Sequence, residues 1–569
     1  MKYIPSLDWI KNYNKSWLSG DISAGLAVGV MLIPQGMAYS MLAGLPPIYG
    51  LYAVTIPLII YALLGTSRQL AVGPVAMVSL LIASGVGSFA ASGSDDYIML
   101  AILLALLVGM IQFTMGVFKL GFLVNFLSHP VIAGFTSAAA IIIGFSQMKH
   151  LLGVKTNGEK LIDIVAQLWS QLSDIHLMSF IIGVSAIIIL IIVKKINKKI
   201  PAPLVVVILG VLIVYLGGLD EQGIKIVGTI PQGLPTFSMP NFDFGTMQKL
   251  LPTAFTIAFV GFMESIAVAK AIHARHKDYK LDANQELVSL GLANMVGSFF
   301  KSFPVTGGFS RTAVNDQAGA KTGLASIISA TLIILTLLFL TSYFYYLPNA
   351  VLAAIILVAV YGLIDFKEAK HLWHTDKTDF YLFVAAVVGT LLLGIEEGIL
   401  LGVLLSLVIL IYRVSYPHVA ELGRLGDGTT FRNTDRFENA QVDDHIIIMR
   451  FDSQLYFANV NYFREKVTDL IKKRNNAAYF ILDASAISTV DSSALHMLHD
   501  LIGELKSSGI DFLVANMIGP VRDIMTKGGV ISIIGKEHCF ISVLSAYEFA
   551  SAEIKNEDID FATQTLIKH

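Results

Sequence analysis

Residues 304–319 read PVTGGFSRTAVNDQAG and interrupt a region that is otherwise strongly apolar. Adjacent glycines and a proline disfavour a continuous helix, and a charged side chain such as Arg311 is costly in lipid. Irregular backbone at membrane depth is tolerated only where it is buried in protein or lines a water-filled cavity. We therefore expect this stretch to break a membrane segment and to line a site inside the protein.

The composition indicates a membrane protein with room for one soluble domain. The chain has 569 residues, of which 55% are hydrophobic and 14% are charged. Soluble domains carry roughly 25% charged residues, so most of this chain has too little polar surface for a globule in water. The net charge of -2 argues against a nucleic-acid partner. Cys539 is the single cysteine, which excludes an internal disulfide and a metal site with several cysteine ligands.

Apolar segments recur along residues 21–415, after an expected cytoplasmic segment at 1–20. Each is roughly 15 to 22 residues long, which suits a hydrocarbon core of about 30 Å, and we expect about 14 of them. They lie near 22–40, 47–64, 74–90, 98–117, 120–147, 179–196, 203–217, 251–272, 286–302, 306–319, 323–341, 349–363, 379–394 and 396–414.

Basic runs orient these segments. KKINKK (194–199), HARHKDYK (273–280) and DFKEAKHLWH (365–374) follow the sixth, eighth and twelfth segments. If the amino terminus is inside, all three runs lie in the cytoplasm, as the excess of Lys and Arg in cytoplasmic loops requires. An even number of segments then places the carboxy-terminal part in the cytoplasm as well.

A soluble α/β domain is expected over residues 436–560. The runs IIIMRF, QLYF, AAYFILDAS and IDFLVAN are typical of strands. NVNYFREKVTDLIKKR, SSALHMLHDLIGELKSSG and MIGPVRDIMTKGG have the spacing and charged faces of surface helices. Their alternation predicts a small cytoplasmic domain with its own core.

The first and eighth membrane segments occupy matching places in two halves. Gln35 lies in the first and Glu264 in the eighth, and each segment is followed by a glycine-rich start to a short helix, AVGPVAMVS at 71–79 and VTGGFSRTA at 305–313. Two interrupted segments at corresponding positions are typical of a transporter site between inverted repeats. With about seven segments per half, an odd number, the second half must be inverted relative to the first.

The starts of these two half-helices have the properties of an anion site. A helix amino terminus offers free N–H groups and about half a positive charge. Gly73, Ala76 and Gly308 are small enough to let an ion approach the backbone. Pro74 suits the first turn of a helix, where its missing donor is harmless.

Four separated stretches resemble one known family. IPQGMAYSMLAGLPPIYGLY (33–52), RQLAVGPVAMVSLL (68–81), FPVTGGFSRTAVNDQAGAKT (303–322) and ILDAS…DSSAL (481–495) are similar, in this order, to the SulP inorganic anion transporters, the solute carrier 26 family. The carboxy-terminal domain resembles STAS, named for sulfate transporters and anti-sigma factor antagonists. The resemblance implies a polytopic α-helical fold of seven plus seven inverted segments, with half-helices at the third and tenth.

The resemblance also implies how this fold would work. Segments 1–4 and 8–11 would form a moving core, and segments 5–7 and 12–14 a gate, in an elevator-type homodimer embedded in lipid. The anion would lie between the half-helix starts, with Arg311 as a fixed positive charge behind it and two side chains of the first segment at its side. The implied binding residues are Gln35, Tyr39, Gly73, Val75, Ala76, Gly308, Phe309, Ser310 and Arg311.

Structural roles remain open for several of these residues. Arg311 could instead pair with Glu264 or extend to a helix end, and Ser310 could bond back to its own helix. Gln35 could link neighbouring helices. Tyr39 is expected to line the cavity, because its hydroxyl needs a partner inside the protein.

Glu264 is the expected cation-coupling residue. A carboxylate in a low-dielectric site tends to hold its proton, and a neighbouring anion strengthens that tendency. The family resemblance implies an acidic residue in this segment that couples transport to H⁺ or to Na⁺. If the coupling ion is Na⁺, Glu264 would be a sodium ligand. A structural pair with Arg311 is the alternative.

These observations predict a secondary active anion transporter, with proton-coupled sulfate uptake favoured. Na⁺-coupled bicarbonate uptake is the alternative, followed by a C4-dicarboxylate transporter or a non-transporting motor or scaffold protein. An enzyme is not expected, because no nucleophile–base pair or metal cluster is visible, and there is no GxxxxGK[ST] loop for an ATP-driven pump. We expect no cofactor. We expect a location in the bacterial inner (cell) membrane, with both termini in the cytoplasm. The STAS domain could also bind cytoplasmic partners.

Overall fold

The computed structural model describes residues 5–122, 128–154, 161–196, 200–240, 243–276, 279–426, 428–474 and 476–567, without the side chains of 395, 396, 399 and 556–567. Residues 123–127 of the fifth expected segment, and 197–199 and 277–278 of the basic runs, lie outside this description. The chain forms two compact units, Met1–Ser406 and Leu407–His569.

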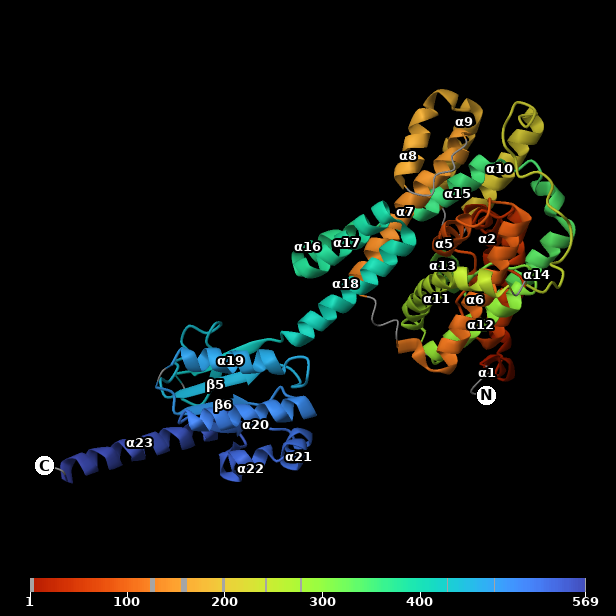
Figure 1. The fold of residues 1–569 in the computed structure, drawn as a ribbon. Helices are drawn as coiled ribbons and strands as arrows, with labels where there is room; N and C mark the ends of the chain where they lie inside the picture. Colours follow the sequence, from red (N-terminus) through yellow and green to blue (C-terminus); the bar gives the residue numbers. More distant parts are fainter. Residues whose placement is uncertain are drawn as a thin grey trace. The chain divides into compact units, whose positions relative to one another are not determined.

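The first unit is helical, and each expected membrane segment contains a helix (Figure 1). These helices are α2 (Leu18–Leu42), α3 (Pro47–Tyr52) with α4 (Ile56–Leu64), α5 (Ala76–Gly87), α6 (Asp95–Val117), α7 (His129–Leu152), α9 (Leu177–Ile196), α10 (Ala202–Gly217), α11 (Phe244–His273), α12 (Ala283–Ser298), α13 (Phe309–Gln317), α14 (Leu324–Phe339), α15 (Asn349–Tyr361), α17 (Lys377–Leu393) and α18 (Ile395–Ser415), whose last residues, after Ser406, belong to the second unit. Shorter helices lie before and between them, namely α1 (Ser6–Lys11), α8 (Leu161–Ser170), α16 (Phe366–Thr375) and 3₁₀ turns at Lys15–Trp17, Leu172–Asp174 and Thr341–Phe344.

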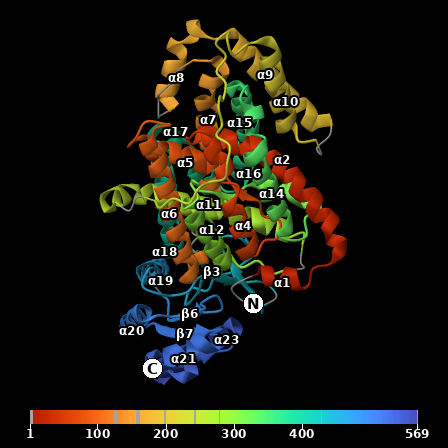
Figure 2. The ribbon, with the colours of Figure 1, turned by 90° about the vertical axis from the view of Figure 1, so that its right-hand side faces the viewer.

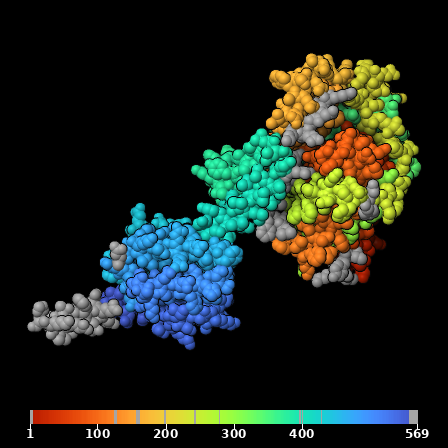
Figure 3. Space-filling view, viewed as in Figure 1, coloured from red at the N-terminus to blue at the C-terminus, as the bar shows by residue number. Residues whose placement is uncertain are grey.

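Length and composition support the membrane setting. Seven described helical stretches are long and apolar enough to cross a membrane. On α9, Ile181, Ile188 and Ile191 are about half exposed, at 47%, 51% and 54%. Side chains of α8–α10, in orange and yellow, form part of the outer surface in Figure 3. Helices that are apolar on the outside as well as the inside are suited to lipid rather than water.

The membrane helices pack in two groups. In the first group, α6 packs against α12 and α11, α2 against α14, and α4 against α12; Figures 1 and 2 both show α6, α11 and α12 side by side. Small residues allow close contact, because a Cβ on Gly109 would lie 2.7 Å from the carbonyl oxygen of Gly291. In the second group, α7 packs against α15 and α17, and α15 against α9. The groups meet where α2 contacts α15 and α10, and where α5 contacts α7.

A two-stranded antiparallel pair links the two halves of the membrane unit. β1 (Val72–Gly73) lies just before α5 in the chain, and β2 (Thr306–Gly307) lies just before α13. Val72 pairs with Gly307, and Gly73 pairs with Thr306. Because the strands are antiparallel, the half-helices that follow them leave the pair in opposite directions.

The second unit is built on a six-stranded sheet with the order β4-β3-β5-β6-β7-β8. The pairs from β5 to β8 are parallel, and β3 is antiparallel to both of its neighbours. The strands are β3 (Val419–Arg424), β4 (Phe431–Asn433), β5 (Ile446–Phe451), β6 (Tyr479–Asp483), β7 (Asp511–Ala515) and β8 (Cys539–Phe540), and the helices are α19 (Val460–Lys472), α20 (Ser492–Ser507), α21 (Gly519–Lys527), α22 (Val530–Ile534), a 3₁₀ turn (Lys536–His538) and α23 (Val543–Ile567).

This sheet differs from the expected one at its amino-terminal end. QLYF does not form a strand; Leu455 makes only an isolated bridge to Val490. Two strands, β3 and β4, instead precede residue 436, where we expected the domain to begin. Sequence pattern did not reveal β3, because VAELGR is short and contains Ala, Glu and Gly, which are uncommon in strands, although Ala420 and Leu422 are buried against the sheet.

Candidate functional site

Two short helices begin inside the membrane unit without a cap. Val75 precedes α5 and Gly308 precedes α13; both residues are extended, both are buried, and no side chain accepts a hydrogen bond from either helix start. The first regular helix bonds are donated by the N–H groups of Ser79 and Thr312. The three N–H groups before each of these have no partner among the described residues, so both helix ends can bind an anion.

The strand pair brings the two helix starts together. Beyond β1 and β2, the Gly308 N–H donates to the carbonyl oxygen of Ala71 at 3.1 Å. The N–H of Ala71 donates to Oγ1 of Thr312 at 3.0 Å. The beginning of α13 is therefore bound directly to the chain that leads into α5, although the two segments are more than 200 residues apart.

Arg311 crosses from α13 to the start of α5. Its side chain is 2% exposed, and Nη1 donates to the carbonyl oxygen of Pro74 at 2.6 Å. Nε and Nη2 have no hydrogen-bond partner among the described residues. A Cβ on Gly308 would lie 2.7 Å from Nη2, and one on Gly73 would lie 3.5 Å from it. Glycine at position 308 therefore leaves space for the guanidinium, whereas a Cβ at position 73 would make only an ordinary contact with it.

The alternative role for Arg311 and Glu264, a structural pair with each other, is not seen in the structure. The two residues are close enough to interact electrostatically, but no ion pair between them is present, and Oε2 of Glu264 is buried without a hydrogen-bond partner. A buried charge without a hydrogen-bonded partner is costly. The site thus holds an incompletely paired cation and an incompletely paired carboxyl group at the same time.

Gln35 and Tyr39 of α2 lie in the interior, as expected for residues beside the site. Gln35 is 5% exposed and its Oε1 has no partner among the described residues. Tyr39 is 7% exposed and interacts electrostatically with both Arg311 and Glu264. Because Oε1 of Gln35 is unbonded, the structure gives no helix-linking role to this oxygen.

The remaining predicted residues divide by exposure. Val75 and Ala76 are buried, at 5% and 6% exposure, whereas Phe309 is 61% exposed and Ser310 is also exposed. Ser310 makes no side-chain hydrogen bond to its own helix in the structure, so the back-bonded alternative is not seen. The start of α13 is therefore the more open of the two helix starts. No group of three or more His, Cys, Asp or Glu side chains suited to a metal ion occurs among the described residues.

Sequence reasoning missed the side chains that hold β2 against α11. Oγ of Ser265, the neighbour of Glu264, accepts from the Gly307 N–H at 2.7 Å and lies 2.6 Å from Oγ1 of Thr306. Thr306 in turn donates to the carbonyl oxygen of Gly261. Only one signal was available in the sequence, namely a hydroxyl residue directly beside an intramembrane acid.

A second missed group fixes the residue before β2. Asn294 is completely buried; its Nδ2 donates to the Val305 carbonyl at 3.0 Å, and its Oδ1 accepts from the Val305 N–H at 2.8 Å. Nδ2 also lies 3.1 Å from Oε1 of Gln112 on α6. Lone amide residues in otherwise apolar segments, such as these two, could have been recognised as partners for irregular backbone.

Comparisons with known proteins match both units. A model of the sulfate permease family matches residues 18–386, and a model of the STAS domain matches residues 438–546. The chain is 40% identical to the chloroplastic sulfate transporter 4.1 of Arabidopsis thaliana, over 98% of this chain and 84% of that protein. It is 35% identical to high affinity sulfate transporter 2 of Stylosanthes hamata, over 96% of this chain and 86% of that protein.

Solved structures show the same fold. Murine Solute Carrier 26 family member A9, an anion transporter solved in the inward-facing state, matches with a TM-score of 0.89 at 29% identity, over 97% of this chain and 94% of that chain. The transmembrane domain of a cyanobacterium bicarbonate transporter, BicA, matches with a TM-score of 0.61 at 24% identity, over 68% of this chain and 98% of that chain. The second likeness concerns the fold alone.

The same comparisons correct the expected location. The sequence led us to expect a bacterial inner membrane, but the relatives named above are plant proteins, and one of them is described as chloroplastic. The comparison therefore points to a eukaryotic membrane, and the bacterial assignment is wrong. The multi-pass membrane character agrees with the helices of the first unit.

Proposed function

The chain belongs to the sulfate permease family, and from that premise we propose that it is a secondary active transporter that takes up sulfate together with protons. Family membership makes it an anion transporter and not an enzyme. Relatives that are 34–40% identical bear the name of sulfate transporters, which favours sulfate as the substrate of this chain.

The pair of uncapped helix starts is the observation that carries the proposal. Six free N–H groups and the unbonded nitrogens of Arg311 converge from α5 and α13. A tetrahedral dianion presents four oxygens, so it can accept from both helix ends and from the guanidinium at once. We propose that this binding site is formed by Gln35, Tyr39, Gly73, Val75, Ala76, Gly308, Phe309, Ser310 and Arg311.

Glu264 is the proposed coupling residue. Its unbonded Oε2 lies in the same interior as Arg311, where an incoming anion would favour the neutral, protonated acid. Loading a proton with sulfate would reduce the net charge that crosses the low-dielectric region. A sodium ion at the same carboxylate is the competing form of this proposal.

The movement we propose is of the elevator type. The helix group α2–α6 with α11–α14, which contains the whole candidate site, would move as a core against α7–α10 and α15–α18. The contacts between the groups are made mainly by α2 and α5, which supports their separation as bodies. A homodimer would supply the stationary frame.

Uptake of radiolabelled sulfate into liposomes that contain the purified protein tests the proposal. An inward-directed proton gradient should accelerate sulfate accumulation, and unlabelled sulfate should compete better than bicarbonate or a C4-dicarboxylate. Uptake that follows an imposed Na⁺ gradient at constant pH would replace the proton by sodium. Bicarbonate uptake without sulfate competition would contradict sulfate as the substrate, and absence of any anion flux would favour a non-transporting role.

A further inference from the structure

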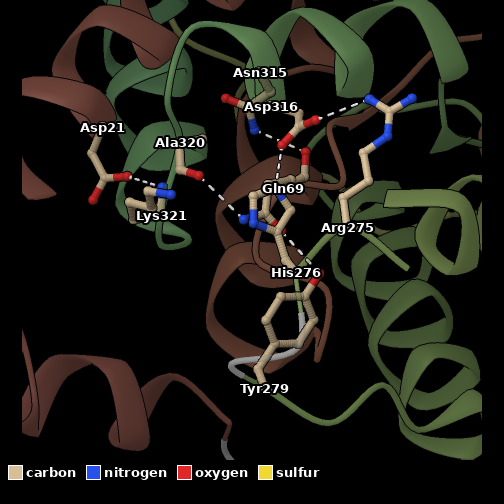
Figure 4. Close-up of polar contacts among 9 residues, drawn as sticks. All are labelled: Asp21, Gln69, Arg275, His276, Tyr279, Asn315, Asp316, Ala320 and Lys321. Carbon is tan, nitrogen blue, oxygen red and sulfur yellow. Dashed lines mark hydrogen bonds and ion pairs between the residues drawn. The ribbon is translucent and has the colours of Figure 1, made fainter. Parts of the chain in front are cut away.

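A buried polar network lies at the end of α13 opposite the anion site, and Figure 4 shows its members. Gln69 is 1% exposed and uses every polar group of its side chain. Nε2 donates to the carbonyl oxygen of Ala320 at 3.1 Å, and Oε1 accepts from the hydroxyl of Tyr279 at 2.9 Å. The main-chain oxygen of Gln69 accepts from Nδ2 of Asn315 at 2.8 Å. Gln69, which lies just before β1, is thereby bonded to Asn315 in the last turn of α13 and to Ala320 just beyond this helix.

The neighbouring residue of α13 binds a different element. The carboxylate of Asp316 contacts His276 and lies 3.5 Å from Nη1 of Arg275, both just beyond the end of α11. A negative charge near a helix carboxy terminus is opposed by the helix dipole, so these two basic partners account for its position. Five residues after Asp316, in the turn beyond α13, the Lys321 N–H donates to Asp21 of α2 at 2.7 Å. The end of α13 is thus held by three separate elements.

The short length of α13 makes this end important for the site. The helix has nine residues, which is about 13 Å, and its free N–H groups point to the anion from the other end. The strand pair fixes only the beginning of the helix. The direction of the helix also depends on where its far end is held. A displacement of the binding groups by about 1 Å can greatly weaken their interaction with the anion.

We propose that Gln69 and Asn315 are positioning residues of the anion site, acting through the direction of α13. They do not touch the anion, and nothing in the sequence pattern pairs them, because they are 246 residues apart. The inference rests on the proposed function, since it takes the start of α13 as part of the anion site. A merely structural network would stabilise the protein without altering anion affinity.

Two substitutions and a matched control separate these roles. Asn315→Ala removes the bond to the Gln69 carbonyl, and Tyr279→Phe removes the hydroxyl that donates to Oε1 of Gln69 while it keeps the ring. Tyr97→Phe is the control, because its completely buried hydroxyl also bonds within the membrane unit, to the Ala43 carbonyl at 2.6 Å, away from α13. The measurements are the KM and maximal rate of anion uptake in liposomes and the melting temperature without anion.

We expect Asn315→Ala to raise KM roughly tenfold and Tyr279→Phe about threefold, because the first variant loses a buried hydrogen bond and the second a partly buried one. The Tyr97→Phe control should leave KM within about twofold while its melting temperature falls as much as that of Tyr279→Phe. A KM unchanged in both test variants, or raised equally in the control, would overturn the inference. If Asn315→Ala does not fold, the milder Tyr279→Phe decides alone.

Measurements on the parent protein distinguish a failure of the proposed function from a failure of the positioning role of Gln69 and Asn315. If the parent transports another anion and not sulfate, the substrate in the proposed function is wrong, and the KM comparison is made with the transported anion. If the parent transports nothing, the same variants are compared by the shift in melting temperature that sulfate, bicarbonate or chloride causes. A parent that none of these anions stabilises would overturn both proposals, because α13 would then have no anion to orient.

Discussion

Replacing Arg311 by alanine should weaken sulfate binding by about two orders of magnitude. In the structure this side chain is 2% exposed, and Nε and Nη2 are free while Nη1 is bound to Pro74. A hydrogen bond from a charged group contributes about 1.5–3 kcal/mol. Two such bonds at the low end of that range give about 3 kcal/mol, which is a factor of roughly 100 to 200 in Kd.

The same substitution should change the stability of the empty protein much less. The carbonyl oxygen of Pro74 loses its donor, which costs about 1–3 kcal/mol. Removal of a buried, incompletely paired guanidinium acts in the opposite direction. Arg311→Lys should restore only part of the affinity, because one compact ammonium group cannot bond to Pro74 and to the anion with the geometry of the planar fork.

Calorimetric titration of sulfate into the protein in lipid nanodiscs measures this effect directly. Lys249→Ala is a suitable control, since it removes an exposed positive charge from a different helix, near the amino terminus of α11. The melting temperature without sulfate should be similar for parent, variant and control. A sulfate Kd of Arg311→Ala within about threefold of the parent would refute the reasoning, because the free nitrogens would then have no anion to bind.

Three further substitutions test other parts of the structure. Gly308→Ala places a Cβ 2.7 Å from Nη2 of Arg311, so the guanidinium must shift, and the sulfate Kd should rise roughly tenfold. Gly245→Ala should leave the Kd unchanged, because its Cβ would make only an ordinary contact, 3.5 Å from Oδ2 of Asp243. Glu264→Gln mimics the protonated acid and should keep sulfate binding while abolishing accumulation driven by a pH gradient in liposomes; undiminished accumulation would remove Glu264 as the coupling residue. In the carboxy-terminal unit, burial alone would raise the pKa of Asp452, but hydrogen bonds from an arginine and a histidine hold this pKa below its ordinary value. This stabilisation is present above the unfolded pKa of about 3.9 and is lost as the pH falls through the folded pKa. Asp452→Asn should therefore lower the melting temperature of this unit at pH 7, and the difference from the parent should shrink as the pH falls through the folded pKa of Asp452; equal melting temperatures at pH 7 would contradict the assignment.

The broken segments could be predicted because their signals are local. Pro74 and the glycines at 307 and 308 exclude a continuous helix at two places, and the structure begins α5 and α13 close to them. The parallel part of the carboxy-terminal sheet could also be predicted, since β6 and β7 are short runs that are apolar except for one aspartate at an end. Local composition was sufficient for both.

Features that depend on pairing between distant residues could not be predicted in this way. β1 and β2 have two residues each, too few for any periodicity. Arg311 was assigned either to the anion or to Glu264, and its actual bond to the Pro74 carbonyl depends on a side-chain direction that spacing does not determine. Gln69 and Asn315 likewise gave no signal, because the role of a buried amide in one half depends on its hydrogen-bond partner in the other half, which the sequence does not show.

The missing caps on α5 and α13 connect the stability of the protein with its binding capacity. A side-chain cap ordinarily stabilises a helix by about 1 kcal/mol, and neither buried helix start has one. The empty site therefore contains two uncapped ends as well as the unbonded nitrogens of Arg311, and the rest of the membrane unit must offset their cost. Bonds such as those from Asn294 to the backbone before β2, outside the anion site, hold the ends in place without occupying their N–H groups. In the proposed site, an anion that enters would supply the missing acceptor to both helices at once, so the energy that caps would have contributed to folding would become available for binding.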